Sequence, residues 1–185
     1  MSKEYYACVY GGASERIDKL YMEAVEELGK VICQNGFSLV YGAGATGCMG
    51  VVARSVHEHG GHIMGISPEF MKDFEDIFPC DNTIMVDTMA ERKTLMEKHA
   101  DIFIIAPGGI GTMDEFFQVL TLKYLKRTSA PIYILNTNGF YNSLLALLND
   151  LVDKKAATDI IHTMYEVIES PFDESFVNTL KNLEN

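Results

Sequence analysis

Pro107-Gly108-Gly109-Ile110-Gly111-Thr112-Met113-Asp114-Glu115 is the stretch that decides the fold. An apolar run that predicts a buried strand precedes it, over residues 102–106, and a helical pattern over residues 116–126 follows it. A strand that runs into a glycine turn and then into a helix directs free backbone N–H groups and the positive end of a helix dipole at one point. Glycines carry no Cβ, so a ligand can approach the backbone closely. The stretch therefore predicts an anion site, suited to a phosphate, with the acid Glu115 beside it.

Apolar runs alternate with helical patterns along the whole chain. Strands are expected over residues 6–10, 37–41, 63–66, 83–86, 102–106, 132–135 and 165–168. Helices are expected over residues 17–34, 49–57, 88–100, 116–126 and 140–151, with a last helix capped by Ser170 and opened by Pro171. This alternation predicts an α/β, Rossmann-like, doubly wound and mostly parallel sheet with helices on both faces. No linker or repeat divides the chain, so residues 1–185 are expected to form a single domain.

Three predicted strands end in glycine turns, at residues 11–12, 42–47 and 108–111. In open parallel sheets, ligands bind beyond the carboxyl ends of the strands. We therefore expect the three turns to meet at one edge of the sheet and to form one pocket.

The composition excludes several classes of partner. The 185 residues carry a formal net charge of −11 and no basic stripe, so DNA and RNA polymers are not expected partners. No run approaches the roughly 20 apolar residues that span a bilayer, and residues 1–5 do not resemble a signal peptide. The four cysteines form no CxxC motif, which is typical of reduced thiols. These features predict a soluble cytoplasmic protein without membrane partners.

The second turn, residues 42–47, matches the pattern G-x-G-x-x-G. A dinucleotide site also needs an acid at the end of the next strand to bind a ribose. That strand ends at Ser67-Pro68, with Glu69 just beyond it, and the turn follows the second strand rather than the first. We therefore expect this turn to line a different nucleotide site, without NAD or FAD.

Two roles are open for Glu115. Thr112 and Glu115 have the spacing of a capping box, S/T-x-x-E, which favours a structural role at the start of a helix. A helix cap does not require three glycines, and the turn contains Gly108, Gly109 and Gly111. Thr112 also has a hydroxyl that can bind a phosphate. These two features favour a chemical role for Glu115.

Arg92 has two interpretations as well. It lies one turn into the predicted helix 88–100, for which Thr88 and Glu91 form a capping box, and it can belong to a solvated charged face. The strand after this helix delivers the central turn, so Arg92 can also reach the same pocket. The planar fork of an arginine suits a phosphate or a carboxylate.

Two other segments attract attention. His57, His59 and His62 resemble a metal cluster, but glycines separate them across a helix end and a strand start, so no metal is expected. Residues 70–82 mix aromatic and acidic side chains, and they are expected to form a packed loop, with a lid over the site as the alternative.

The chain resembles a known family. Residues 107–115 are similar to the P-G-G-x-G-T-x-x-E signature of the Lonely Guy (LOG) proteins, cytokinin riboside 5′-monophosphate phosphoribohydrolases that were long mislabelled lysine decarboxylases. Residues 89–93 resemble the second family motif, M-x-x-R-K, and residues 41–44 and 47–50 resemble Y-G-G-G and G-L-M-G. The likeness extends from about residue 6 to residue 151.

The resemblance implies a homodimer that hydrolyses the N-glycosidic bond of a purine nucleoside 5′-monophosphate, AMP or a cytokinin-type ribotide, without a cofactor. The products are the free base and ribose 5-phosphate. Carried over onto this sequence, the resemblance makes Arg92 and Glu115 the catalytic pair. It assigns substrate and phosphate binding to Gly108, Gly109, Gly111, Thr112, Lys93, Gly42, Gly44, Ser14 and Met89.

Two alternatives remain open. A non-catalytic nucleotide carrier, or a carrier of molybdenum cofactor with a similar fold, needs the glycine turns but not the arginine and the acid. A decarboxylase that uses pyridoxal phosphate needs a Schiff-base lysine, for which only Lys93 lies near the predicted site. Release of base from AMP distinguishes the hydrolase from the carrier.

Overall fold

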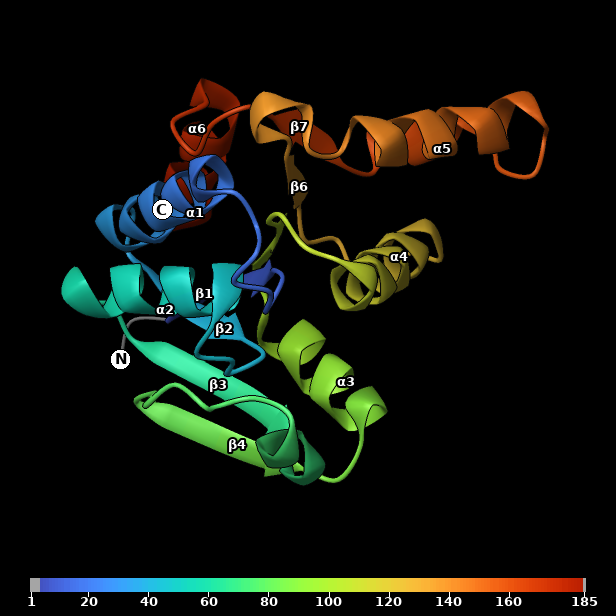
Figure 1. Ribbon diagram of the computed structural model, residues 1–185. Coiled ribbons are helices and arrows are strands. Elements are labelled where there is room, and N and C mark those ends of the chain that lie inside the picture. Colours follow the sequence, from blue (N-terminus) through green and yellow to red (C-terminus); the bar gives the residue numbers. More distant parts are fainter. Residues whose placement is uncertain (1–3, 185) are drawn as a thin grey trace.

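Seven strands alternate with six α-helices along residues 4–184, which the computed structural model describes (Figure 1). The strands are β1 (Tyr5–Tyr10), β2 (Phe37–Tyr41), β3 (Ile63–Pro68), β4 (Asn82–Val86), β5 (Ile102–Ile105), β6 (Ile132–Leu135) and β7 (Glu166–Ile168). The α-helices are α1 (Lys19–Gln34), α2 (Gly47–Glu58), α3 (Met89–His99), α4 (Ile110–Tyr124), α5 (Asn142–Asp153) and α6 (Glu174–Glu184). Short 3₁₀ turns are η1 (Glu69–Asp73), η2 (Thr137–Gly139) and η3 (Asp159–Thr163).

The strands form one sheet in the order β4-β3-β2-β1-β5-β6-β7, and every pairing is parallel. The chain winds outward from β1 to β4 and then crosses back to β5, which lies beside β1 with Val9 opposite Ile104. The winding direction reverses between β1 and β5, so the turns after these two strands diverge and leave a crevice at the carboxyl edge. The predicted α/β, Rossmann-like fold is confirmed.

Helices cover both faces of the sheet, as the ribbon shows (Figure 1). On one face, α1, α2 and α6 bury apolar side chains, including Leu28, Val52 and Phe176. On the other face, α3, α4 and α5 bury Met96, Phe116 and Leu148 among others. Strands β2 and β5 are buried along their whole length, as expected for a parallel sheet that is covered twice. None of the helices within residues 4–184 is long and apolar enough to cross a membrane.

Two predicted helix starts are wrong. Helix α4 begins at Ile110 rather than at residue 116, because the central glycine turn itself forms the first helical turn. Helix α6 begins at Glu174, and Ser170 and Pro171 lie in the turn before it. The carboxylate of Asp173 accepts a hydrogen bond of 3.1 Å from the Ser175 amide, so Asp173 takes the capping role that was predicted for Ser170.

Candidate active site

The three glycine turns meet at the carboxyl edge of the sheet, at the junction of β1 and β5. The Gly12 amide donates to the Pro107 carbonyl at 3.0 Å, which joins the first turn to the central one. The Met49 amide in α2 donates to the Gly12 carbonyl at 3.3 Å, which joins the first turn to the helix that follows the second turn. The expected gathering of the three turns is therefore present in the structure.

The glycines of the central turn are required for packing at one position and leave open space at two others. A Cβ at Gly108 would overlap the Thr112 side chain, so packing alone requires glycine there. A Cβ at Gly109 or Gly111 would have no described atom within 4 Å, and both residues are exposed. Gly109 is the N-cap of α4 and supplies no side-chain cap, so no N-cap side chain satisfies the first amides of the helix, and Gly109 and Gly111 line the cavity. This arrangement suits a phosphate held by backbone N–H groups.

Thr112 and Glu115 do not form the capping box that their spacing allows. Both lie inside α4, whose N-cap is Gly109. Their side chains are buried, with relative exposures of 3% for Thr112 and 7% for Glu115. The cap interpretation of Glu115 is therefore wrong, and its carboxyl group is free for another role.

Arg92 lies opposite Glu115 rather than on a solvated helix face. The predicted capping box of Thr88 and Glu91 starts α3, so Arg92 lies in the first turn of this helix. Its side chain is directed into the protein, with 5% of the residue surface exposed. Its Nη2 atom is 3.7 Å from Glu115 Oε1. A Cβ at Gly42 would overlap the guanidinium, so the second glycine turn makes room for this side chain. Arg92 Nε is buried and has no hydrogen-bond partner among the described residues.

The environment of Glu115 prepares it for proton chemistry near neutral pH. Burial raises the pKa of its carboxyl group from 4.5 to about 7, and the Arg92 guanidinium opposes this shift. A general base works best when its pKa is near the operating pH. Glu115 can therefore ionise close to pH 7, beside a fixed positive charge.

A second carboxylate, which the sequence analysis did not single out, lines the same cavity as Glu115. Glu75 belongs to the segment between β3 and β4, where the Ala45 amide donates to the Asp76 carbonyl and the Phe78 amide donates to the Ala43 carbonyl, both at 2.9 Å. These bonds attach the segment to the second glycine turn. Burial raises the pKa of Glu75, and the charge of Arg92 lowers it. The mixture of acids and aromatics in residues 70–82 was the available signal.

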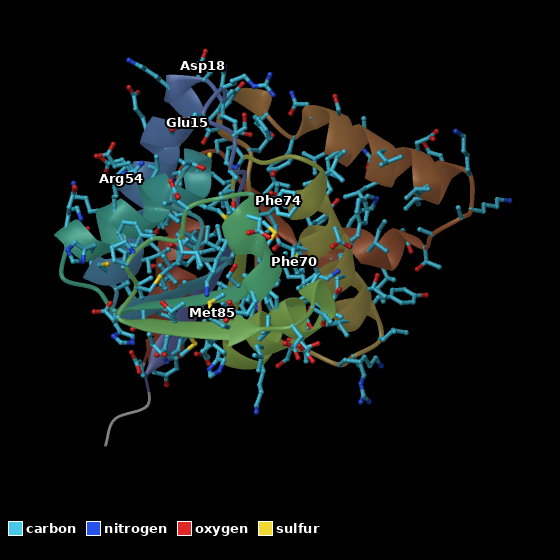
Figure 2. All side chains as sticks on the ribbon, turned by 60° about the horizontal axis from the view of Figure 1, so that its bottom comes forward. Glu15, Asp18, Arg54, Phe70, Phe74 and Met85 are labelled. Carbon is cyan, nitrogen blue, oxygen red and sulfur yellow. The ribbon has the colours of Figure 1, made fainter. Side chains whose placement is uncertain are left out.

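The same segment has an apolar outer side. Phe70 and Phe74 are 44% and 76% exposed, and Figure 2 shows both on the segment that follows β3, with the edge strand β4 in front. Met71 lies on the cavity side. Residues 70–82 therefore form an irregular segment that contributes one wall of the cavity, and none of them is fully buried.

The cavity has a volume of about 440 Å³, within the usual range for small-molecule sites. Its apolar lining includes Ile17, Met49, Met71, Met89 and Phe140. Its polar lining includes most of the predicted site residues, namely Ser14, Arg92, Gly108, Gly109, Gly111, Thr112 and Glu115, and also Glu75. Of the other predicted residues, Gly42 lies against Arg92, and Gly44 lies next to Met49 and Glu75. Lys93 does not line the cavity, because its Nζ atom is 2.7 Å from Asp114 Oδ2 outside it.

The histidines of residues 57–62 do not converge. His59 Nδ1 lies 2.8 Å from the Ser55 carbonyl oxygen of its own helix, whereas His62 Nδ1 lies 3.8 Å from Asp81 Oδ2. Within the described part of the chain, no three His, Cys, Asp or Glu side chains are arranged to hold a metal ion.

Comparison with solved structures supports the fold alone. The molybdenum cofactor binding protein of the phototrophic bacterium Rippkaea orientalis superposes with a TM-score of 0.72 over 99% of both chains, at 18% sequence identity. At this identity, the likeness carries no argument about the ligand.

Comparison of sequences identifies the family. A family profile described as "possible lysine decarboxylase" matches residues 49–174. The cytokinin riboside 5′-monophosphate phosphoribohydrolase LOG5 of Arabidopsis thaliana is 38% identical over 79% of this chain, and the match spans only 64% of that relative's length. LOG3 of the same plant is 36% identical over 83% of this chain and 72% of its own length. The chain therefore belongs to the LOG family, whose profile still has the older lysine decarboxylase description.

Proposed function

We propose that the protein hydrolyses the N-glycosidic bond of a purine nucleoside 5′-monophosphate, AMP or a cytokinin-type ribotide, to the free base and ribose 5-phosphate. One observation carries the proposal: Arg92 and Glu115, 23 positions apart in the chain, face each other at 3.7 Å in a cavity that also contains the uncapped start of α4. The names of the sequence relatives support the same substrate class.

The 5′-phosphate binds at the N-terminus of α4. The exposed glycines Gly109 and Gly111 leave the backbone amides accessible, and the hydroxyl of Thr112 lies in the same turn. The helix dipole favours a negative charge at this end. A phosphate fixed there limits how far the sugar can move, which lowers the entropy cost of aligning its anomeric carbon.

Glu115 and Arg92 act at the sugar. Breaking an N-glycosidic bond builds positive charge on the ring, as in glycoside hydrolysis. The Glu115 carboxylate stabilises that charge or accepts a proton from the attacking water, and its pKa of about 7 suits the second role. The guanidinium of Arg92 orients the nucleotide and keeps a counter-charge beside the carboxylate. Burial of both side chains strengthens these electrostatic interactions.

The apolar wall supports a purine rather than a small polar group. Met49, Met71, Met89 and Phe140 offer polarisable and aromatic contacts to the face of a base. The carboxylate of Glu75 lies in the same cavity and can accept hydrogen bonds from sugar hydroxyls. No residue in this scheme requires a metal or a redox cofactor.

A homodimer and a cytoplasmic location belong to the same proposal. Large apolar side chains are exposed on α4, at its C-cap and on α5, namely Ile110, Tyr124, Leu125 and Leu147. An exposed apolar surface of this kind supports burial against a second copy of the chain. Ile110, at 91% exposure, lies within the phosphate turn itself. Four free cysteines are consistent with a reducing compartment.

A carrier without catalytic activity is the second candidate. Its link to this chain is the shared fold with the molybdenum cofactor binding protein, a likeness that says nothing of the ligand. A carrier needs the uncapped start of α4, but it does not need a buried arginine and acid that face each other. Burying these charges is costly, and Arg92 Nε is left without a hydrogen-bond partner among the described residues.

Release of free base separates the two candidates. The purified protein is incubated with AMP, a cytokinin-type ribotide and pyrimidine monophosphates, and the released bases are measured by chromatography. We expect release from purine monophosphates and at least about a hundredfold lower kcat/KM for the matching nucleosides, because they lack the phosphate that aligns the sugar. Tight binding without release by the wild type would favour the carrier.

A further inference from the structure

The interface between α3 and α4 contains a second ion pair beside the buried one. Lys93 follows Arg92 in α3, and Asp114 precedes Glu115 in α4. Lys93 Nζ is 2.7 Å from Asp114 Oδ2. One helical turn further along both helices, Gln118 Nε2 donates a hydrogen bond to Glu97 Oε1. Two ion pairs and one hydrogen bond thus join the same faces of the two helices.

The position of Lys93 does not suit a phosphate ligand. Its side chain is 13% exposed and is already paired with Asp114. Glu97, four residues later, is near enough for the charge of Lys93 to lower its pKa. The ammonium group therefore lies near two acids, and it does not line the cavity.

We propose that Lys93 is a positioning residue for the reaction proposed above: it binds Asp114 across the helix interface, holds α3 against α4, and so keeps Arg92 facing Glu115 without touching the substrate. The inference rests on the proposed function for its kinetic part only. Its structural part, an ion pair between Lys93 and Asp114 that joins α3 to α4 beside Arg92 and Glu115, stands on the described geometry.

The charges around Glu115 explain how Lys93 acts at a distance. Burial raises the pKa of Glu115, Arg92 lowers it, Asp114 raises it, Lys93 lowers it and Glu75 raises it. Neutral groups near this carboxyl come from two other elements, Cys8 and Tyr10 on β1 and Tyr141 before α5. Because Lys93 and Asp114 have opposite effects, the intact pair leaves little net charge. Removing either partner alone leaves the other charge unbalanced beside Glu115.

The test uses Lys93→Met, Lys93→Arg and Asp114→Asn in the full chain, with Lys98→Met as the matched control on the exposed side of α3. Glu115 is titrated directly by its carboxyl ¹³C NMR shift, and kcat and KM for AMP are measured against pH. We expect K93M to raise the Glu115 titration midpoint and D114N to lower it, each by about half a pH unit. K93R and K98M should titrate like the wild type.

The kinetic expectation separates positioning from binding. K93M should lower kcat about tenfold with KM for AMP changed less than about threefold, because the guanidinium loses its alignment while the phosphate turn stays intact. K93R should restore most of kcat. An unchanged Glu115 titration in both K93M and D114N, or a tenfold rise in KM without loss of kcat, would overturn the proposal. The NMR titration needs no turnover, so a wild type that releases no base would refute the proposed function and leave this inference testable.

Discussion

Two ion pairs join α3 to α4 next to each other, and their surroundings differ. Lys93 and Asp114 are in close contact at 2.7 Å, and 57% of the Asp114 side chain is exposed. Arg92 and Glu115 are 3.7 Å apart, with side-chain exposures of 6% and 8%. The pair with the shorter contact is the one at the surface, so the distance between charges does not identify the pair suited to chemistry.

Burial explains the difference. In the Lys93–Asp114 pair one partner, Asp114, lies in solvent, and an ion pair screened in this way contributes at most about 1 kcal/mol to stability. A buried pair without full hydrogen bonding pays for desolvation and keeps unsatisfied groups, here including Arg92 Nε. Such groups are available to a substrate. The inner pair, Arg92–Glu115, is therefore suited to bind and react, whereas the outer pair, Lys93–Asp114, is suited to hold the helices together.

The largest expected effect comes from removing the inner carboxylate. Glu115→Gln should lower kcat/KM for AMP by about 10³-fold or more, because the amide cannot accept the proton or stabilise the developing charge. The neighbouring Asp114→Asn makes the same chemical change in the outer pair and should cost less than about tenfold. Initial rates of base release measure both. Similar losses in the two variants would remove the distinction between the pairs.

A smaller effect is expected from displacing the guanidinium without changing its charge. In Gly42→Ala, the new Cβ would overlap Arg92 Nη2, and the flexible side chain would have to move. We expect about a hundredfold loss of kcat/KM with the fold retained, because a displaced arginine no longer aligns the substrate.

Gly44→Ala is the matched control in the same turn. Its Cβ would lie 2.5 Å from Met49 Cε, the end of another flexible side chain, rather than on the guanidinium. A loss below about tenfold is expected for G44A. Circular dichroism and thermal melting would verify that both variants fold. If G42A retained wild-type activity, the exact place of Arg92 would not matter.

The smallest effect concerns Glu75, the other carboxylate that lines the cavity. Glu75→Gln should lower the maximal kcat/KM about tenfold, the value of one hydrogen bond to the sugar. The charge of Glu75 raises the pKa of Glu115, so its removal should move the acid limb of the pH–rate profile to lower pH. The sign follows because activity needs the Glu115 carboxylate and therefore rises with pH through the pKa of this group. A limb that moved to higher pH, or did not move, would contradict this assignment.

Local sequence patterns predicted most helices and strands. They were wrong where a capping-box spacing and a glycine turn share the same residues, as in residues 108–115. The capping box of Thr88 and Glu91 is present in the structure, but the identical spacing of Thr112 and Glu115 is not a cap. In the first case a threonine precedes the helix. In the second case Gly109 already starts the helix, so Thr112 lies inside it. Sequence spacing cannot tell which residue is the N-cap, because the start of α4 depends on how the glycine turn packs against Gly12.

The site was predictable where a turn directly follows a strand. Gly109, Gly111 and Glu115 follow β5 in sequence, and their place at the sheet edge follows from parallel topology. Glu75 was not singled out because it comes from an irregular segment, which is positioned by hydrogen bonds to residues more than 30 positions earlier. The family resemblance assigned Lys93 to substrate and phosphate binding. In the structure its ammonium group pairs with Asp114 outside the cavity, because consecutive helical residues point about 100° apart.

The order of apolar runs, glycine turns and caps determined by itself the α/β fold, the parallel sheet and the edge at which the glycine turns meet, because these depend on local periodicity and on backbone sterics. Only the tertiary structure decided which charged residues are buried together. Burial and charge pairing depend on contacts between elements distant in the chain, and it is these contacts that raise the pKa of Glu115 to about 7 and leave Asp114 in solvent.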